Sequence, residues 1–205
     1  MKKTLGFLVL LLGCSAHAGD TADLVKRLGQ FEALSGSFEQ MMLDKSGTRL
    51  RDESGTMDMA RGNRFRWHTQ EPYEQLAISD GQTVWFYEPD LEQVVVRPLG
   101  ENLTNTPALL FGGDPARVSE AFTVKRTRNT ASEQVYQLSP KLDDSLFSVL
   151  EVTFENSRPA SMRLEDALGQ QTLLTFRELT INGSIPAERF AFVIPDGVDV
   201  IRQDE

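Results

Sequence analysis

Hydrophobic and polar residues alternate in short runs between positions 38 and 99, and turn-forming residues separate these runs. A period of two is typical of strands with one buried face, and short turns join neighbouring strands in antiparallel order. The pattern therefore predicts a series of antiparallel hairpins. The separating triplets are Lys45-Ser46-Gly47, Arg61-Gly62-Asn63, Ser79-Asp80-Gly81 and Glu88-Pro89-Asp90.

A second set of strand-like runs follows at 121–126, 134–139, 147–154, 161–165 and 171–179. Turn residues again break the pattern, at Asn156-Ser157 and at Leu168-Gly169. The two sets amount to about ten or eleven strands, with no repeat of fixed period and no low-complexity linker. So many short strands in one chain predict a mostly β fold that forms a barrel, a sandwich or a strongly curved sheet.

Two segments carry helical patterns instead. Asp20 or Thr21 can cap a helix that runs to about Leu34. Apolar residues at the spacing i, i+4 and i+7 would give this helix one buried face. These residues are Leu24, Leu28 and Phe31.

The second helical segment, NTPALLFGGDPARVSEAF at 105–122, predicts two short helices back to back. Thr106-Pro107 starts the first helix and Gly112-Gly113 ends it after about one turn. Asp114-Pro115 repeats the start signal for a helix that reaches about residue 121. Because a helix of one turn does not persist alone in water, its apolar side chains are expected to lie on an apolar surface. They are Leu109, Leu110 and Phe111.

The N-terminus reads as an export signal, with Lys2 and Lys3 followed by an apolar stretch too short to span a bilayer. Two alternative processing sites could end this signal. Cleavage after Ala16-His17-Ala18 would release a soluble domain at 19–205, whereas a lipobox at Leu11-Leu12-Gly13-Cys14 would leave an acylated cysteine and a membrane anchor. Leu12 argues against the anchor, because the residue two before a lipidated cysteine is usually small.

The composition of the chain excludes several classes of binding partner. Cleavage at the first site leaves 187 residues, which suits a single domain, and changes the net charge from -9 to -11. This charge opposes binding to nucleic acid or to anionic membrane surfaces. The sequence after residue 18 has no cysteine, so it forms neither a disulfide nor a thiolate metal site.

Signals of catalysis are weak. The chain lacks a nucleophile elbow, a phosphate-binding loop and a zinc-binding histidine pair. His68 follows Trp67 in a strand pattern and is interpreted as a surface residue, and the acidic pairs Asp143-Asp144 and Asp196/Asp199 are interpreted as solvated turns. A pair of carboxylates on facing strands remains as an enzyme hypothesis. We expect a protein that is not an enzyme and needs neither cofactor nor metal.

Large apolar residues are concentrated between positions 57 and 87. Alternation places Phe65 and Trp67 on one face of a strand, with Arg64 and Arg66 on the other. Further apolar residues are expected to extend that same face, which is either an ordinary core or a binding cavity with adaptable walls. They are Met57, Met59, Leu76, Ile78, Trp85 and Tyr87.

Three motifs spread over the chain resemble those of a known family, the periplasmic carriers of outer-membrane lipoproteins (LolA family). They are RGNRFRWHTQEPYEQLAISDGQTVWFYEPDLEQV, TNTPALLFGGDP and AERFAFVIPDGVDVIRQDE. The resemblance implies an incomplete antiparallel β-barrel of about eleven strands, closed by a lid of short α-helices. Its hollow would hold the acyl chains of a lipoprotein.

The resemblance also implies roles for single residues. Arg61 matches the arginine that holds the lid shut through bonds to lid backbone carbonyls, here expected within 108–112, and Phe65 matches an aromatic residue at the cavity mouth. The family often has Arg-Pro where this chain has Arg61-Gly62, which loosens the backbone beside the hinge.

The expected function is that of a monomeric periplasmic chaperone. An ATP-driven inner-membrane complex would release lipoproteins to it, and an outer-membrane acceptor would receive them. Three alternatives stay open: an anchored acceptor of the same fold lipidated at Cys14, a regulatory sensor with a related β-domain, and an enzyme.

Overall fold

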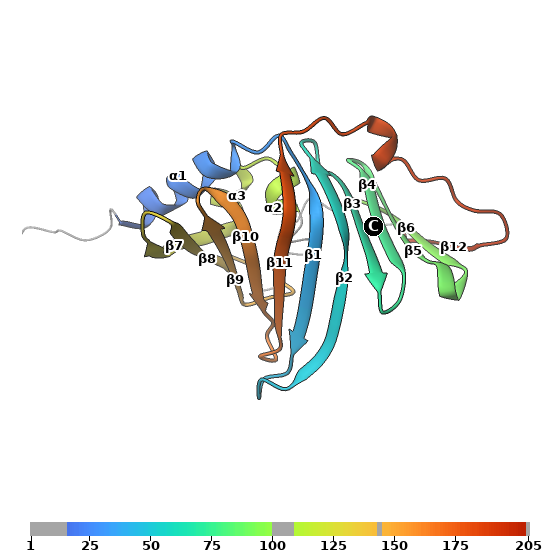
Figure 1. Cartoon of the computed structure of the whole chain (residues 1–205), viewed down its shortest axis with the longest axis horizontal. Coiled ribbons are helices and arrows are strands. Elements are labelled where there is room, and N and C mark those ends of the chain that lie inside the picture. Colours follow the sequence, from blue (N-terminus) through green and yellow to red (C-terminus); the bar gives the residue numbers. More distant parts are fainter. Residues whose placement is uncertain (1–15, 100–108, 143–144, 204–205) are drawn as a thin grey trace, which may run out of the picture.

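Twelve strands form one strongly curved sheet in the computed structural model, which describes residues 16–99, 109–142 and 145–203 (Figure 1). The strand order is β12-β6-β5-β4-β3-β2-β1-β11-β10-β9-β8-β7. The first six strands in sequence are β1 (Ala33–Leu43), β2 (Arg49–Ala60), β3 (Arg64–Glu71), β4 (Gln75–Asp80), β5 (Thr83–Glu88) and β6 (Gln93–Pro98). The other six are β7 (Phe122–Asn129), β8 (Glu133–Pro140), β9 (Val149–Glu155), β10 (Arg158–Glu165), β11 (Gln171–Ile181) and β12 (Asp199–Arg202).

Neighbouring strands pair antiparallel throughout, except that β12 runs parallel to β6. β7 and β12 stand at opposite ends of the strand order, so the sheet does not close on itself. The fold is thus mostly β, as the strand pattern predicts, and matches the incomplete barrel that the family resemblance implies. The hairpin turns at 45–47, 61–63 and 79–81 all lie at or beside junctions between consecutive strands.

Three helices lie on the concave side of the sheet: α1 (Ala16–Leu28), α2 (Leu109–Gly112) and α3 (Arg117–Ala121). α1 packs against β7 and α3, whereas α2 packs against β1, β2 and β3. Two single-turn 3-10 helices lie within the described residues, η1 (Pro89–Leu91) between β5 and β6, and η3 (Ala187–Phe190) on the way from β11 to β12.

Two sequence predictions need correction. The first helix begins at Ala16, before the predicted cap at Asp20 or Thr21, and ends at Leu28 rather than near Leu34. Phe31 is buried after the helix, and Leu34 already belongs to β1. Their helix-like spacing arises because both contribute to the same core. β12 was not predicted, because four residues with mostly exposed side chains give little signal and a parallel partner far away in sequence leaves none.

The main core lies on the concave face. It joins buried side chains of the three helices, Phe31 in the connection after α1 and inward positions of most strands. Leu24, Leu28 and Phe31 belong to it, as the apolar spacing predicts. The helices therefore cover the concave face of the sheet, where the candidate site lies.

Candidate functional site

The short helix α2 covers the middle of the concave face. Leu110 and Phe111 are both buried, at 3% and 2% exposure. The Phe111 ring meets Phe31, Phe154 and Phe176 edge-on, at centroid distances of 6.1, 6.4 and 5.8 Å. The expected start of this helix at Thr106-Pro107 lies outside the described residues, as does the side chain of Leu109. A helix of one turn is thus docked through two large apolar side chains.

Arg61 connects α2 to the end of α1. Its Nη1 donates to the carbonyl oxygen of Gly113 at 2.6 Å, and its Nη2 donates to the carbonyl oxygen of Leu28 at 2.5 Å. The side chain is about one-fifth exposed, and its Nε lies 4.0 Å from the Glu32 carboxylate. The side-chain bond thus falls one residue beyond the expected range of 108–112, and the bond to Leu28 was not anticipated.

The turn that carries Arg61 makes a further contact with α2. The backbone N–H of Asn63 donates to the Gly112 carbonyl at 3.1 Å. Gly62 and Asn63 have φ angles of +82° and +60°. Because proline is fixed near -65°, the Arg-Pro common in the family does not fit this turn. The turn has a defined left-handed geometry rather than a loosened backbone.

Four of the eight predicted cavity residues share the concave face. Met59 pairs with Phe65 and Met57 with Trp67 across β2 and β3, so all four side chains lie on one side. Met57, Met59 and Phe65 are buried, and the Trp67 ring stacks on Phe38 at 4.0 Å.

Beside Trp67 lies a hollow of about 340 Å³, here called the methionine hollow. Its lining comes from β1, β2, β3, β10 and β11 and is largely apolar. The lining residues are Gln40, Met42, Met59, Trp67, Met162, Leu164, Thr172, Leu174 and Phe176.

A second hollow of about 410 Å³ lies on the other side of Trp67, here called the polar hollow. Arg51, Glu53 and Thr69 border it, together with Gln75, Ala77 and Phe86 among others. Leu76 and Tyr87 also contribute to its border. Trp67 lines both hollows and therefore separates them.

The other four predicted cavity residues do not share the concave face. Leu76 pairs with His68 and Ile78 with Arg66, and the pairs continue to Tyr87 and Trp85 on β5. The prediction of a single apolar face is therefore wrong. The turn after β3 sets the register of β4, and the alternation within each strand does not reveal how the strands align.

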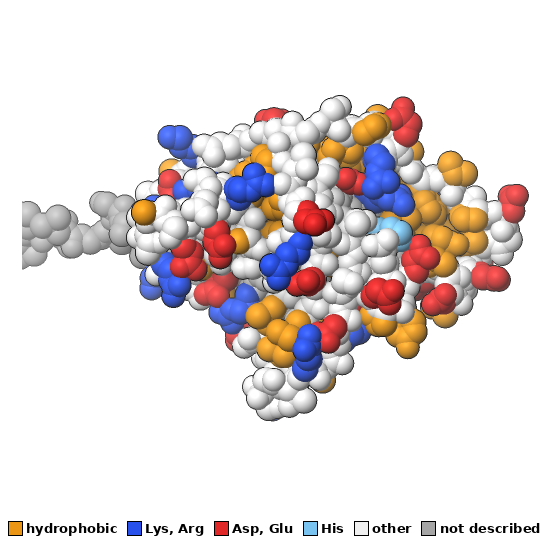
Figure 2. Space-filling model, viewed as in Figure 1, with side chains coloured by type: hydrophobic (Ala, Val, Ile, Leu, Met, Phe, Trp, Pro, Cys, Tyr) orange, Lys and Arg blue, Asp and Glu red, His pale blue; other side chains and the backbone are white. Residues whose placement is uncertain are grey.

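These four residues form part of a convex apolar cluster with η3 and the residues after it. Phe190 is 2% exposed, and Phe192 lies 6.3 Å from Trp85 and 5.6 Å from Tyr87 between ring centroids. Figure 2 shows apolar side chains gathered at the right of this face, over β4–β6 and next to the histidine. An ion pair between Arg189 and Asp58 at 2.5 Å fixes η3 to β2.

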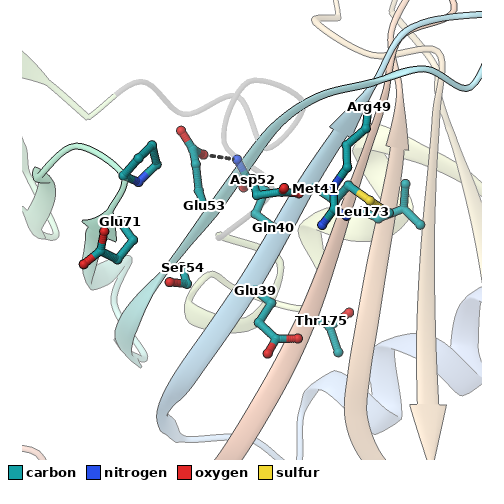
Figure 3. A pocket seen from close by; sticks show the side chains of 11 residues that line it. Glu39, Gln40, Met41, Arg49, Asp52, Glu53, Ser54, Glu71, Leu173 and Thr175 are labelled. Atoms are coloured by element: carbon teal, nitrogen blue, oxygen red, sulfur yellow. Dashed lines mark hydrogen bonds and ion pairs between the residues drawn. The ribbon is translucent and has the colours of Figure 1, made fainter.

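A third pocket, of about 540 Å³, extends over β11, β1 and β2 to the end of β3 (Figure 3). Its lining is rich in carboxylates, namely Glu39, Asp52, Glu53 and Glu71. Glu53 and Gln40 face each other and bond, whereas Glu39 and Thr175 lie on the opposite side of the strands. Among the described residues, no group of three or more metal-ligating side chains is placed to hold a metal ion.

A polar cluster that was not predicted fixes α1 to the sheet. Asp23 accepts a bond from the Tyr136 hydroxyl and another from Arg126 Nη1 at 2.9 Å, and Asp20 accepts from the Arg126 backbone N–H at 3.0 Å. Burial, together with the bond to Asp23, raises the pKa of the Tyr136 hydroxyl. Partners this far apart in sequence leave no local pattern.

Residues 29–193 match the model of the family described as outer membrane lipoprotein carrier protein LolA. The chain belongs to this family. The match covers α2, Arg61 and the whole sheet except β12.

Two relatives extend over nearly the full chain. An outer-membrane lipoprotein carrier protein of Alcanivorax borkumensis is 51% identical and covers 100% of both chains. One of Pseudomonas aeruginosa is 41% identical over 98% of both. An uncharacterised conserved protein of Thermus thermophilus shares the fold, with a TM-score of 0.53 and 14% identity over 91% of this chain and 99% of that one.

Within the described residues, no helix is both long and apolar enough to cross a bilayer.

Proposed function

We propose that this protein is a periplasmic chaperone that carries outer-membrane lipoproteins by burying their acyl chains against the concave face of the sheet. The observation that carries the proposal is an apolar, methionine-lined hollow next to a one-turn helix that covers the same face. Methionine and aromatic side chains adapt to flexible apolar guests. The names of the full-length relatives support the same cargo.

The small volume of the methionine hollow indicates that the lid, helix α2, must move to admit cargo. At about 30 Å³ per methylene group, roughly the volume of a water molecule in the liquid, 340 Å³ holds on the order of eleven groups. Three acyl chains need several times more space. Their exposure to water would cost about 0.8 kcal/mol per methylene. Leu110 and Phe111 occupy the adjacent apolar surface, so cargo and lid compete for it.

Arg61 is suited to a reversible closure. Hydrogen bonds from a charged donor contribute about 1.5–3 kcal/mol each, which is enough to favour a docked lid and is small beside the burial of acyl chains. The guanidinium supplies several donors in a fixed plane, so one side chain holds carbonyls from both α1 and the segment after α2. We infer that Arg61 is the hinge of the lid and Phe65 part of the cavity mouth.

Further inferences concern the export of the protein and the membranes between which it carries lipoproteins. We infer cleavage after Ala18, a periplasmic and monomeric protein, an ATP-driven donor complex in the inner membrane and an acceptor at the outer membrane. The intact mass of the mature protein after export tests the first step. A soluble chain that starts at Gly19 fits a diffusible carrier, whereas an acylated chain that starts at Cys14 would identify an anchored acceptor.

Replacing Arg61 with leucine tests the hinge. We expect Arg61→Leu to fold but to fail in passing lipoprotein from donor to acceptor membranes in a reconstituted assay. Arg177→Leu is the matched control, because Arg177 forms an exposed ion pair with Glu39 on the convex face. Wild-type transfer by Arg61→Leu would refute the hinge.

A further inference from the structure

A charged network interrupts the apolar concave face. Gln40 on β1 pairs directly with Glu53 on β2, and its side-chain amide donates to the Glu53 carboxylate. Arg51 Nε lies 3.0 Å from the other oxygen of that carboxylate. The Glu53 side chain is only 10% exposed, whereas that of Arg51 is 49% exposed. The carboxylate is therefore held from two sides while the guanidinium reaches solvent (Figure 3 shows the Gln40–Glu53 bond).

This network lies between the two hollows of the concave face. Gln40 lines the methionine hollow, whereas Arg51 and Glu53 line the polar hollow, and Trp67 borders both. Glu53 precedes Arg61 by eight residues along β2, roughly 25 Å at about 3.3 Å per residue. The network thus lies at the opposite end of the strand from the lid hinge.

Stability does not account for this ion pair, in which Glu53 is largely buried and Arg51 is half exposed. Desolvation of the carboxylate offsets much of the attraction, and a pair with an exposed partner contributes little, so apolar residues of the same size often stabilise a fold equally well. A surface that binds only hydrocarbon would also gain from apolar residues here. The polar groups therefore indicate a ligand that has a polar part.

The network offers hydrogen-bond donors. Arginine has five N–H groups and no acceptor, and Nε is directed at Glu53. Nη2 lies 3.8 Å from the Met42 sulfur, a weak acceptor that a carbonyl oxygen can replace. The Glu53 carboxylate fixes the orientation of both donor side chains. Neutral oxygen acceptors are the ligand groups that match this arrangement.

We propose that Gln40 and Arg51, which Glu53 holds in place, donate to the ester and amide carbonyl oxygens through which acyl chains are attached to a lipoprotein. This rests on the proposed function. Carbonyls that are buried together with their chains need donors, because an unpaired polar group in an apolar site is costly. With its carbonyls at Arg51, a cargo places chains in the two hollows on either side of Trp67. Its polypeptide leaves at the end of the sheet that the lid does not cover.

The test compares a triacylated cysteinyl peptide with an analogue whose two ester-linked chains are replaced by ether-linked chains of equal length. Both ligands compete with a fluorescent apolar dye bound to the full-length mature protein. Wild type is expected to prefer the ester ligand by on the order of tenfold, the effect of one charge-assisted hydrogen bond. Arg51→Met/Glu53→Gln removes the ion pair without leaving an unpaired charge, and it should bind both ligands with the affinity of the ether analogue.

Arg177→Met is the matched control and should keep the wild-type preference. Retention of the ester preference in the double variant, or no preference in wild type, would overturn this proposal and leave acyl binding intact. Failure of wild type to bind either ligand would overturn the proposed function itself. The two failures are therefore distinguishable.

Discussion

The two faces of the sheet bury similar aromatic and aliphatic side chains but are covered in different ways. On the concave face, α2 is a helix of one turn whose described contacts to Arg61 and Asn63 are hydrogen bonds to backbone carbonyls. On the convex face, η3 is followed by a strand that pairs with β6. A cover whose chain continues into a strand of the sheet is expected to stay in place, whereas a one-turn helix held by two apolar side chains and a few hydrogen bonds can leave.

The charged contacts also differ between the convex face, which η3 covers, and the concave face, which α2 covers. Arg189 forms an ion pair with the largely buried Asp58, and the Arg64 guanidinium lies 5.3 Å from the centre of the Phe190 ring. Burial and the nearby Arg189 lower the pKa of Arg66 on the same face. Loss of Arg189 would leave the largely buried Asp58 carboxylate uncompensated, whereas Arg61 donates to two neutral carbonyls and lies 4.0 Å from the exposed Glu32 carboxylate. We therefore expect substitutions in η3 to change mainly the stability of the fold, and substitutions in α2 to change mainly the binding of apolar ligands.

The largest expected effect is on the convex face. Phe190→Ala should lower the free energy of unfolding by about 3–5 kcal/mol, because the substitution removes a fully buried ring and leaves a cavity. Urea denaturation measures the loss. Binding of an apolar dye by the remaining folded protein should stay unchanged. A folded Phe190→Ala variant that binds the dye much more tightly would mean that the convex cluster is also a binding surface.

A smaller loss of stability is expected for Phe111→Ala, although Phe111 is equally buried. The vacated space adjoins a hollow, so neighbouring side chains can relax into it, and the cost should fall below that of Phe190→Ala. Affinity for the apolar dye should rise, since the lid competes less strongly for the concave face. Dye titration measures this change, and a clear fall in affinity would place Phe111 among the binding residues instead.

Much of this architecture could be predicted because its signals are local. Turn residues at Lys45-Ser46-Gly47 and Arg61-Gly62-Asn63 define hairpins by their own conformational preferences, and Gly112-Gly113 ends α2 in the same way. The mostly β class of the fold follows from these short-range rules. The membership of the family follows from motifs that span the chain.

The rest depends on contacts between distant segments. The register of β4 decides that Leu76 and Ile78 lie on the convex face, and a three-residue connection gives no sign of that register. The partners of Arg61 are backbone carbonyls, which any residue provides. The Gln40–Glu53 pair joins two strands through a register that only the folded sheet fixes.

The smallest expected effect sharpens the comparison most, because a matched control exists within the chain. Gly62 and Gly47 have φ angles of +82° and +83°, and a Cβ at either position would meet nothing within 4 Å. Substitution by alanine should therefore cost each turn about the same, roughly 1–2 kcal/mol for a left-handed residue. Only the turn at Gly62 carries the bonds to Gly112 and Gly113. Gly62→Ala should thus raise dye affinity and Gly47→Ala should not, at equal loss in urea denaturation. Equal dye affinity in the two variants would mean that the hinge turn does not control the lid.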